Sequence, residues 1–243
     1  MASPSPAPSG RHSPSARSAR LDRLLRDLGS ELRRGGSDPC EARAALATGI
    51  PALDGLLGGG IARGELSELF GPLSSGRTSL ALALLARATE VGEVVAVVDT
   101  ADAFHPASAR SAGVQLERVL WARPPGVREA VRASERLLRA RGFAAVLLDA
   151  TGRAAEWEAL PAAVWQRLTR AAAAGDAALI VVSLRRVTGS QAGLALQLQP
   201  TRAHFTGTPA LFEGLEIVAA IDRQRRGPPG RPAALSLRTA REG

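Results

Sequence analysis

The stretch GPLSSGRTS (71–79) follows the phosphate-binding loop pattern G-x-x-x-x-G-K-[ST] at every required position except the lysine. Arg77 stands where the pattern has that lysine. The residues before the loop, GELSELFG (64–71), have the composition of a buried strand, and TSLALALLARA (78–88) has that of a helix. This strand–loop–helix context is the one that the motif requires, so the stretch predicts an α/β fold built around the loop.

The chemistry of such a loop is phosphate binding. Gly71 and Gly76 let the backbone bend, so that its N–H groups and the helix N-terminus face an anion. Thr78, followed by Ser79, stands where a hydroxyl would hold Mg²⁺. The usual lysine is a compact charge, whereas the guanidinium of Arg77 is planar and larger, so the exchange is not conservative.

A second element of a nucleotide site is Asp149, at the end of the apolar run AAVLLD (144–149). A carboxylate at a strand tip is the usual partner of a phosphate loop on the metal. The alternative is a strand-end aspartate that caps a neighbouring turn. We interpret the set as a vestigial nucleotide site, with these members: Gly71, Gly76, Arg77, Thr78, Ser79 and Asp149.

The rest of the main segment alternates strands and helices. Continuous apolar strands between helices predict a mostly parallel sheet with helices on both faces. At the end of the chain, LEIVAAIDRQ (215–224) and AALSLR (233–238) flank RRGPPG, which predicts an antiparallel hairpin at the sheet edge. The expected strands are 64–71, 93–100, 118–124, 143–150 and 177–183, and the expected helices are 78–88, 126–142 and 155–175, the last interrupted by Pro161.

The helix expected at 126–142 carries an arginine stripe opposite its apolar face. A solvated outer face with a Glu135–Arg139 pair is the favoured interpretation, and contact with phosphate is the alternative. The stripe consists of Arg128, Arg132, Arg136 and Arg139, and the apolar face of Val127, Val131, Leu137 and Leu138.

Charge and composition place limits on function. The net charge of +8 resides in the termini: residues 1–40 carry +3 and residues 223–243 carry +5, while 41–222 balance 18 arginines against 18 acids. No apolar run approaches a membrane span, and the first residues lack a secretory signal. Because Cys40 is the single cysteine, the composition suits a reducing cytoplasm.

The composition also divides the chain. Residues 1–17 are expected to be a disordered leader, 18–34 an amphipathic helix, 35–46 a linker and 47–240 the α/β core with its hairpin. The helix can pack on its own domain or dock on another protein, and the two interpretations are about equally supported. Its apolar stripe is the expected partner-binding surface and consists of Leu21, Leu24, Leu25 and Leu28.

Two stretches carry a resemblance to a known family. TGIPALDGLLGGGIARGELSELFGPLSSGRTSLALALLA (48–86) and VVDTADAFHPASARSAGVQLERVLWARP (97–124) resemble the ATPase core of the RecA family. The resemblance extends from about residue 47 to 238 and is strongest over 47–124. It implies a RecA-like core, and it also shows which functional positions have changed.

Four positions depart from the family pattern. Arg77 replaces the loop lysine; Ala101, two residues after Asp99, replaces the catalytic glutamate; Ser108 replaces the tyrosine that contacts adenine; and Leu184 replaces the glutamine that senses the γ-phosphate. Alanine and leucine supply neither a general base nor an amide. The resemblance therefore implies a chain without ATPase activity and without an ATP or Mg²⁺ cofactor.

The DNA-binding loops of the family are also reduced. TGRAAE (151–156) and RRVTGSQAG (185–193) are short and contain no aromatic residue on which a base could stack. We expect at most weak, salt-sensitive DNA contact. The candidate arginines are Arg185, Arg186, Arg223, Arg225, Arg226 and Arg231.

Among RecA relatives, the chain resembles the ImuA proteins of bacterial damage-induced mutagenesis cassettes. Shared features are a single domain, a leading amphipathic helix, a degenerate loop and a basic hairpin with RRGPPGR (225–231). The resemblance implies a non-catalytic role in translesion synthesis within the SOS response, in the bacterial cytoplasm or at the nucleoid. Implied partners are an inactive Y-family polymerase homologue (ImuB-like), RecA and an error-prone replicative-type polymerase. The alternative is an ATP-binding or ATP-hydrolysing RecA- or KaiC-like protein.

Overall fold

The computed structural model describes residues 45–225 and 232–238. All described residues belong to one compact unit, Ala42–Gly243. The predicted leader and leucine helix, with Leu21, Leu24, Leu25 and Leu28, therefore lie outside the described residues, as do Arg226 and Arg231.

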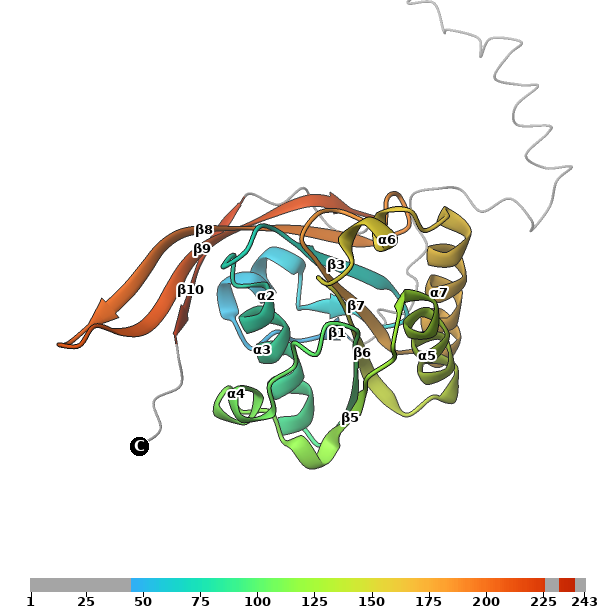
Figure 1. Ribbon diagram of the computed structural model, residues 1–243, viewed down its shortest axis with the longest axis horizontal. Coiled ribbons are helices and arrows are strands. Elements are labelled where there is room, and N and C mark those ends of the chain that lie inside the picture. The colour runs from blue at the N-terminus through green and yellow to red at the C-terminus, as the bar shows by residue number, and fades with distance from the viewer. Residues whose placement is uncertain (1–44, 226–231, 239–243) are drawn as a thin grey trace, which may run out of the picture. The chain divides into compact units, whose positions relative to one another are not determined.

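The domain is organised by an eight-stranded sheet in the order β10-β9-β8-β3-β7-β6-β4-β5 (Figure 1). The six strands from β8 to β5 are parallel to their neighbours, and β9 and β10 are added antiparallel at one edge. The predicted fold class, a mostly parallel α/β sheet with a C-terminal antiparallel hairpin, is confirmed. The strands of this sheet are β3 (Leu66–Phe70), β4 (Val94–Asp99), β5 (Val119–Ala122), β6 (Phe143–Ala150), β7 (Ala178–Ser183), β8 (Leu194–Thr206), β9 (Leu211–Gln224) and β10 (Ala233–Arg238).

Helices cover both faces of the sheet, because the side chains of each strand alternate between two apolar clusters. One cluster packs under α2 and α3, and the other under α5, α6 and α7. Trp157 and Trp165 are fully buried in the second cluster, with ring centroids 6.2 Å apart. The helices are α2 (Pro51–Leu57), α3 (Arg77–Glu90), α4 (Pro106–Ser111), α5 (Val127–Ala140), α6 (Ala154–Glu158) and α7 (Ala162–Gly175), with one 3₁₀ turn at Leu116–Arg118.

Two local features of the helices agree with the sequence: the break at Pro161 and the ion pair on α5. Pro161 is the N-cap of α7 and separates it from α6, as the interruption predicted. On α5, Arg139 pairs with Glu135 at 3.0 Å on an exposed face, as expected of a solvated stripe. No helix among the described residues has the length and apolar character needed to cross a membrane.

Two features were not expected. The long strand β8 pairs with β3 and then continues beside β9, so that these two strands extend past the helices (Figure 1). In addition, a two-stranded pairing of β1 (Ala45–Leu46) with β2 (Ile61–Ala62) begins inside the segment predicted as a linker.

Candidate functional site

The phosphate loop lies at the carboxyl end of β3 and opens α3, as the motif predicted. Gly76 is the N-cap of α3 and has a left-handed backbone with φ of 80°. A Cβ at Gly71 would lie 2.1 Å from the carbonyl oxygen of Leu198, and one at Gly76 would lie 2.7 Å from Leu237 Cδ1. Gly71 is therefore required by the close approach of the β8 backbone, and Gly76 by its left-handed backbone conformation.

Arg77, the residue that departs from the motif, turns into the protein. The residue is buried, with 7% of its surface exposed. Nε donates to Ser75 Oγ at 3.1 Å, and Nη1 donates to the carbonyl oxygen of Ser183 at 2.7 Å. The guanidinium therefore ties the start of α3 to the end of β7. Thr78 and Ser79, by contrast, are exposed.

The end of β7 is also held from its other side. Ser183 Oγ donates to Glu68, a fully buried carboxylate on β3, at 3.0 Å. Glu68 further accepts the backbone N–H of Val187 at 2.7 Å, as well as the N–H and hydroxyl of Thr188. A continuous set of hydrogen bonds thus runs from the phosphate loop through Ser183 and Glu68 to the segment after β7.

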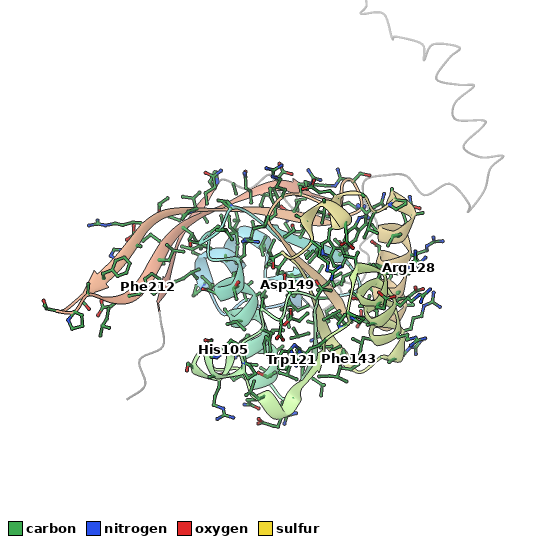
Figure 2. All side chains as sticks on the ribbon, viewed as in Figure 1. His105, Trp121, Arg128, Phe143, Asp149 and Phe212 are labelled. Carbon is green, nitrogen blue, oxygen red and sulfur yellow. The ribbon has the colours of Figure 1, made fainter. Side chains whose placement is uncertain are left out.

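Asp149 lies at the tip of β6, in the centre of the view in Figure 2, and interacts electrostatically with Arg77. Burial raises the pKa of the Asp149 carboxyl; hydrogen bonds from Thr151 N and Oγ1, at 2.8 and 2.6 Å, oppose the rise. The negative charge of Asp99 raises the pKa further, and the positive charge of Arg77 lowers it. Burial likewise lowers the pKa of the Arg77 guanidinium, and Asp149 opposes that shift.

Asp99 is the register partner of Asp149 on the adjacent strand β4. Its two oxygens accept the N–H groups of Ala101, Ala103 and Phe104 at 2.9–3.1 Å, and Nε1 of Trp121 at 3.3 Å. The carboxylate therefore shapes the turn after β4. Ala101, where the family resemblance places a catalytic glutamate, is exposed on this turn and has no group that could activate water.

A cleft of about 930 Å³ lies beside the loop. Hydroxyls and apolar groups line it, and Arg77 is the one charged residue among them. Ser108, at the position of the expected tyrosine, is on the wall, and its backbone N–H donates to His105 Nδ1 at 3.2 Å. The other lining residues are Ile50, Ser74, Ser75, Gly76, Thr78, Ser79, Leu82, Ala83, Ser111, Ala112, Ala203, Phe205, Phe212, Leu215, Ser236 and Leu237.

Four of the candidate DNA-contact arginines are among the described residues: Arg185 and Arg186 follow β7, and Arg223 and Arg225 lie at the end of β9. Arg186 pairs with Asp222 and donates to the carbonyl of Gly189, while Arg223 Nε donates to that of Ala192 at 3.1 Å. Arg225 contacts the carbonyl of Ser190 at 3.4 Å. These side chains fasten the segment to β9, whereas Arg185 is exposed.

Glu68 is the site residue that sequence reasoning missed. The signal was present: a glutamate stands inside the apolar strand LSELF, where a charge without partners would be costly. Its partners, Val187 and Thr188, are about 120 residues away in the sequence, at separations of 119 and 120. Spacing alone gave no way to connect them.

The site has the shape of a nucleotide loop, but its charged groups are occupied within the chain. The loop cation binds Ser75 and Ser183, and both strand-end carboxylates accept hydrogen bonds from neighbouring turns. In a phosphoryl-transfer centre the cation, a metal carboxylate and a base all face the phosphates, whereas here the loop cation and the carboxylates form hydrogen bonds within the chain.

We predict that Arg77→Met lowers the free energy of unfolding by about 1.5–3 kcal/mol, because it removes hydrogen bonds from a buried charged donor. Urea denaturation measures the difference. Arg87→Met on the same helix is the matched control, because Arg87 is exposed and forms only an i,i+3 pair with Glu90. Its expected effect is within about 0.5 kcal/mol. Equal losses in the two variants would show that Arg77 has no special structural role.

A second prediction concerns pH. Since the folded pKa of Asp149 is raised, the native state binds the proton more tightly, and stability falls as pH rises from the ordinary aspartate value of about 4 to the folded pKa. Asp149→Asn should remove this decline. Urea titrations across the acid range measure it, with Asp102→Asn as an exposed control. An unchanged pH profile in Asp149→Asn would contradict the assignment.

Comparison with known proteins agrees with this geometry. Residues 20–193 match the model of the RecA N-terminal domain. The RecA protein of Rubrobacter xylanophilus is 35% identical over 131 residues, covering 53% of this chain and 38% of that protein. The RecA protein of Paramagnetospirillum magneticum is 33% identical over 169 residues, covering 67% and 44%. The chain thus spans less than half the length of these relatives.

A solved structure gives the same result for the fold. The crystal structure of the RadB recombinase superposes with a TM-score of 0.62 at 26% sequence identity, covering 78% of this chain and 94% of that one. The family match extends over more than half of the sequence and includes the phosphate loop. This chain belongs to the RecA family.

Proposed function

We propose that this chain is a DNA-repair protein of the RecA family that does not hydrolyse ATP and acts through protein contacts in damage-induced mutagenesis. Its setting would be translesion synthesis in the SOS response of a bacterial cytoplasm. The observation that carries the proposal is the inward orientation of Arg77, whose donors bind Ser75 and Ser183. A guanidinium held there is not positioned to neutralise charge on a transferring phosphoryl group.

The other changed positions support the same conclusion. Ala101 provides no carboxylate to activate water, and Leu184 provides no amide to report a γ-phosphate. Ser108 offers a small hydroxyl where an aromatic ring would pack on a base. Each change removes a different part of an ATPase, so restoring one residue would not restore turnover.

The proposed partners come from the resemblance to ImuA proteins. They are an inactive Y-family polymerase homologue (ImuB-like), RecA itself and an error-prone replicative-type polymerase. The leucine stripe of residues 18–34 is the proposed contact with RecA. The arginines of residues 223–243 would add weak contact with DNA phosphates, through counterion release.

A nucleotide-binding but non-hydrolysing regulator is the second candidate. The observation in its favour is the preserved loop: Gly76 keeps its left-handed turn, and Thr78 and Ser79 are exposed at a cleft of about 930 Å³. Equilibrium binding of labelled ATP distinguishes this candidate from a chain that has no nucleotide ligand.

We predict no metal-dependent phosphate release from ATP, because the family's ATPase residues are replaced at four positions: Arg77, Ala101, Ser108 and Leu184. The measurement is a steady-state phosphate assay on wild type and Thr78→Ala, in which both should match the rate without protein. Turnover that requires Mg²⁺ and disappears in Thr78→Ala would refute the proposal and favour a working ATPase.

We also predict that RecA binds the wild-type chain and not a Leu24→Asp, Leu28→Asp double variant. Aspartate on the apolar stripe would remove burial worth about 1.5–3 kcal/mol per leucine. A pull-down with purified RecA measures the difference, and the double variant Ser3→Asp, Ser5→Asp in the leader controls for added charge. If RecA binds both leucine forms equally, or neither, then the helix is not its docking element.

A further inference from the structure

The outer face of α5 and α7 carries a concentration of positive charge that the proposed function does not use. The two helices contain six arginines and two glutamates, a net charge of +4, although residues 41–222 as a whole are neutral. They pack together on the side of the domain where Arg128 lies, away from the cleft side marked by Phe212 (Figure 2).

The arginines form one row. Arg128, Arg132 and Arg136 are exposed and recur every four residues, so they lie within an arc of about 80° and advance by about 6 Å from one to the next. Arg139 falls inside the same arc. Guanidinium groups in a row along a helix can contact successive phosphates of a nucleic-acid strand.

The ion pairs at α5 leave most of the positive charge of the row uncompensated. Glu135 accepts from Arg139 at 3.0 Å and from Arg167 on α7 at 2.8 Å, so one carboxylate is shared by two guanidinium groups. Both ion pairs lie at one end of the row. No ion pair is formed by Arg128, Arg132 or Arg136 within the described residues.

The outer face of α5 and α7 has no large exposed apolar side chain among the described residues, and this indicates the kind of partner it can bind. The large apolar side chains that are exposed in the described part of the chain all lie elsewhere, and none is on α5 or α7: Leu73, Val91, Val94, Leu120, Phe205, Leu211 and Phe212. A protein interface normally has an apolar or aromatic centre inside a polar rim. Contact with a phosphate backbone needs only positioned charges.

We propose that the arginine row of α5, Arg128, Arg132 and Arg136, binds the phosphodiester backbone of nucleic acid without sequence preference. These residues are different from the candidate arginines of the segment after β7 and of the end of β9, and the proposal does not depend on the accessory role. The absence of an aromatic platform on the row means that it contacts phosphates and not bases.

The test is fluorescence anisotropy of the full chain with a labelled duplex DNA between about 50 and 200 mM salt. Arg128→Gln, Arg132→Gln, Arg136→Gln should reduce the slope of log K against log salt by about 2.7 and weaken binding at least about tenfold. The matched control, Arg87→Gln, Arg110→Gln, Arg202→Gln, removes the same charge from other exposed positions and should change the slope by less than about 1.

Two further arms make the outcome decisive. The triple Arg→Lys variant of the row keeps the charges and should retain the wild-type slope within about 1. No binding by wild type at low salt, or equal losses in the two Gln variants, would overturn the proposal. A row variant that keeps its DNA affinity but loses a polyglutamate peptide would also overturn it and assign the face to an acidic protein.

Discussion

A buried cation has to be satisfied inside the protein, and Arg77 is that cation here. Its guanidinium is removed from water at the start of α3, where it binds Ser75 and the carbonyl of Ser183. Burial of a charged group without hydrogen-bond partners would cost far more free energy than burial of an unpaired neutral polar group. Its two hydrogen bonds connect the loop to the end of β7.

The hydrogen bonds of Arg77 affect residues beyond the loop, because Ser183 binds both Arg77 and Glu68. Its carbonyl receives Arg77 and its hydroxyl reaches Glu68, which in turn holds Val187 and Thr188. Arg186 fixes the same segment to Asp222 on β9. The segment between β7 and β8 is therefore anchored by groups of the chain itself, and a nucleotide is not needed to set its conformation.

Local patterns in the sequence were enough to identify most of the fold. The apolar runs of β4, β6 and β7, the loop at 71–79 and the break at Pro161 each carry their own signal. Strand β8 was missed because LALQLQPTRAHFT mixes polar residues with a proline and resembles a loop. The direction of Arg77 was missed for another reason: its acceptor is 106 residues away, and only tertiary packing brings Ser183 beside it. The sequence thus predicted the place of the loop in the fold, but not the conformation of its central side chain.

The long strand β8 has a consequence for how the protein behaves at high concentration. Its register with β3 covers Ser67 to Phe70, and beyond Gln197 its described neighbour is β9 alone. An unpaired strand edge is a template for association between copies. Pro200, which has no N–H to donate, and the exposed Arg202 both lie on that stretch. The chain can therefore extend a ribbon into solvent while resisting the edge-to-edge growth that leads to aggregates.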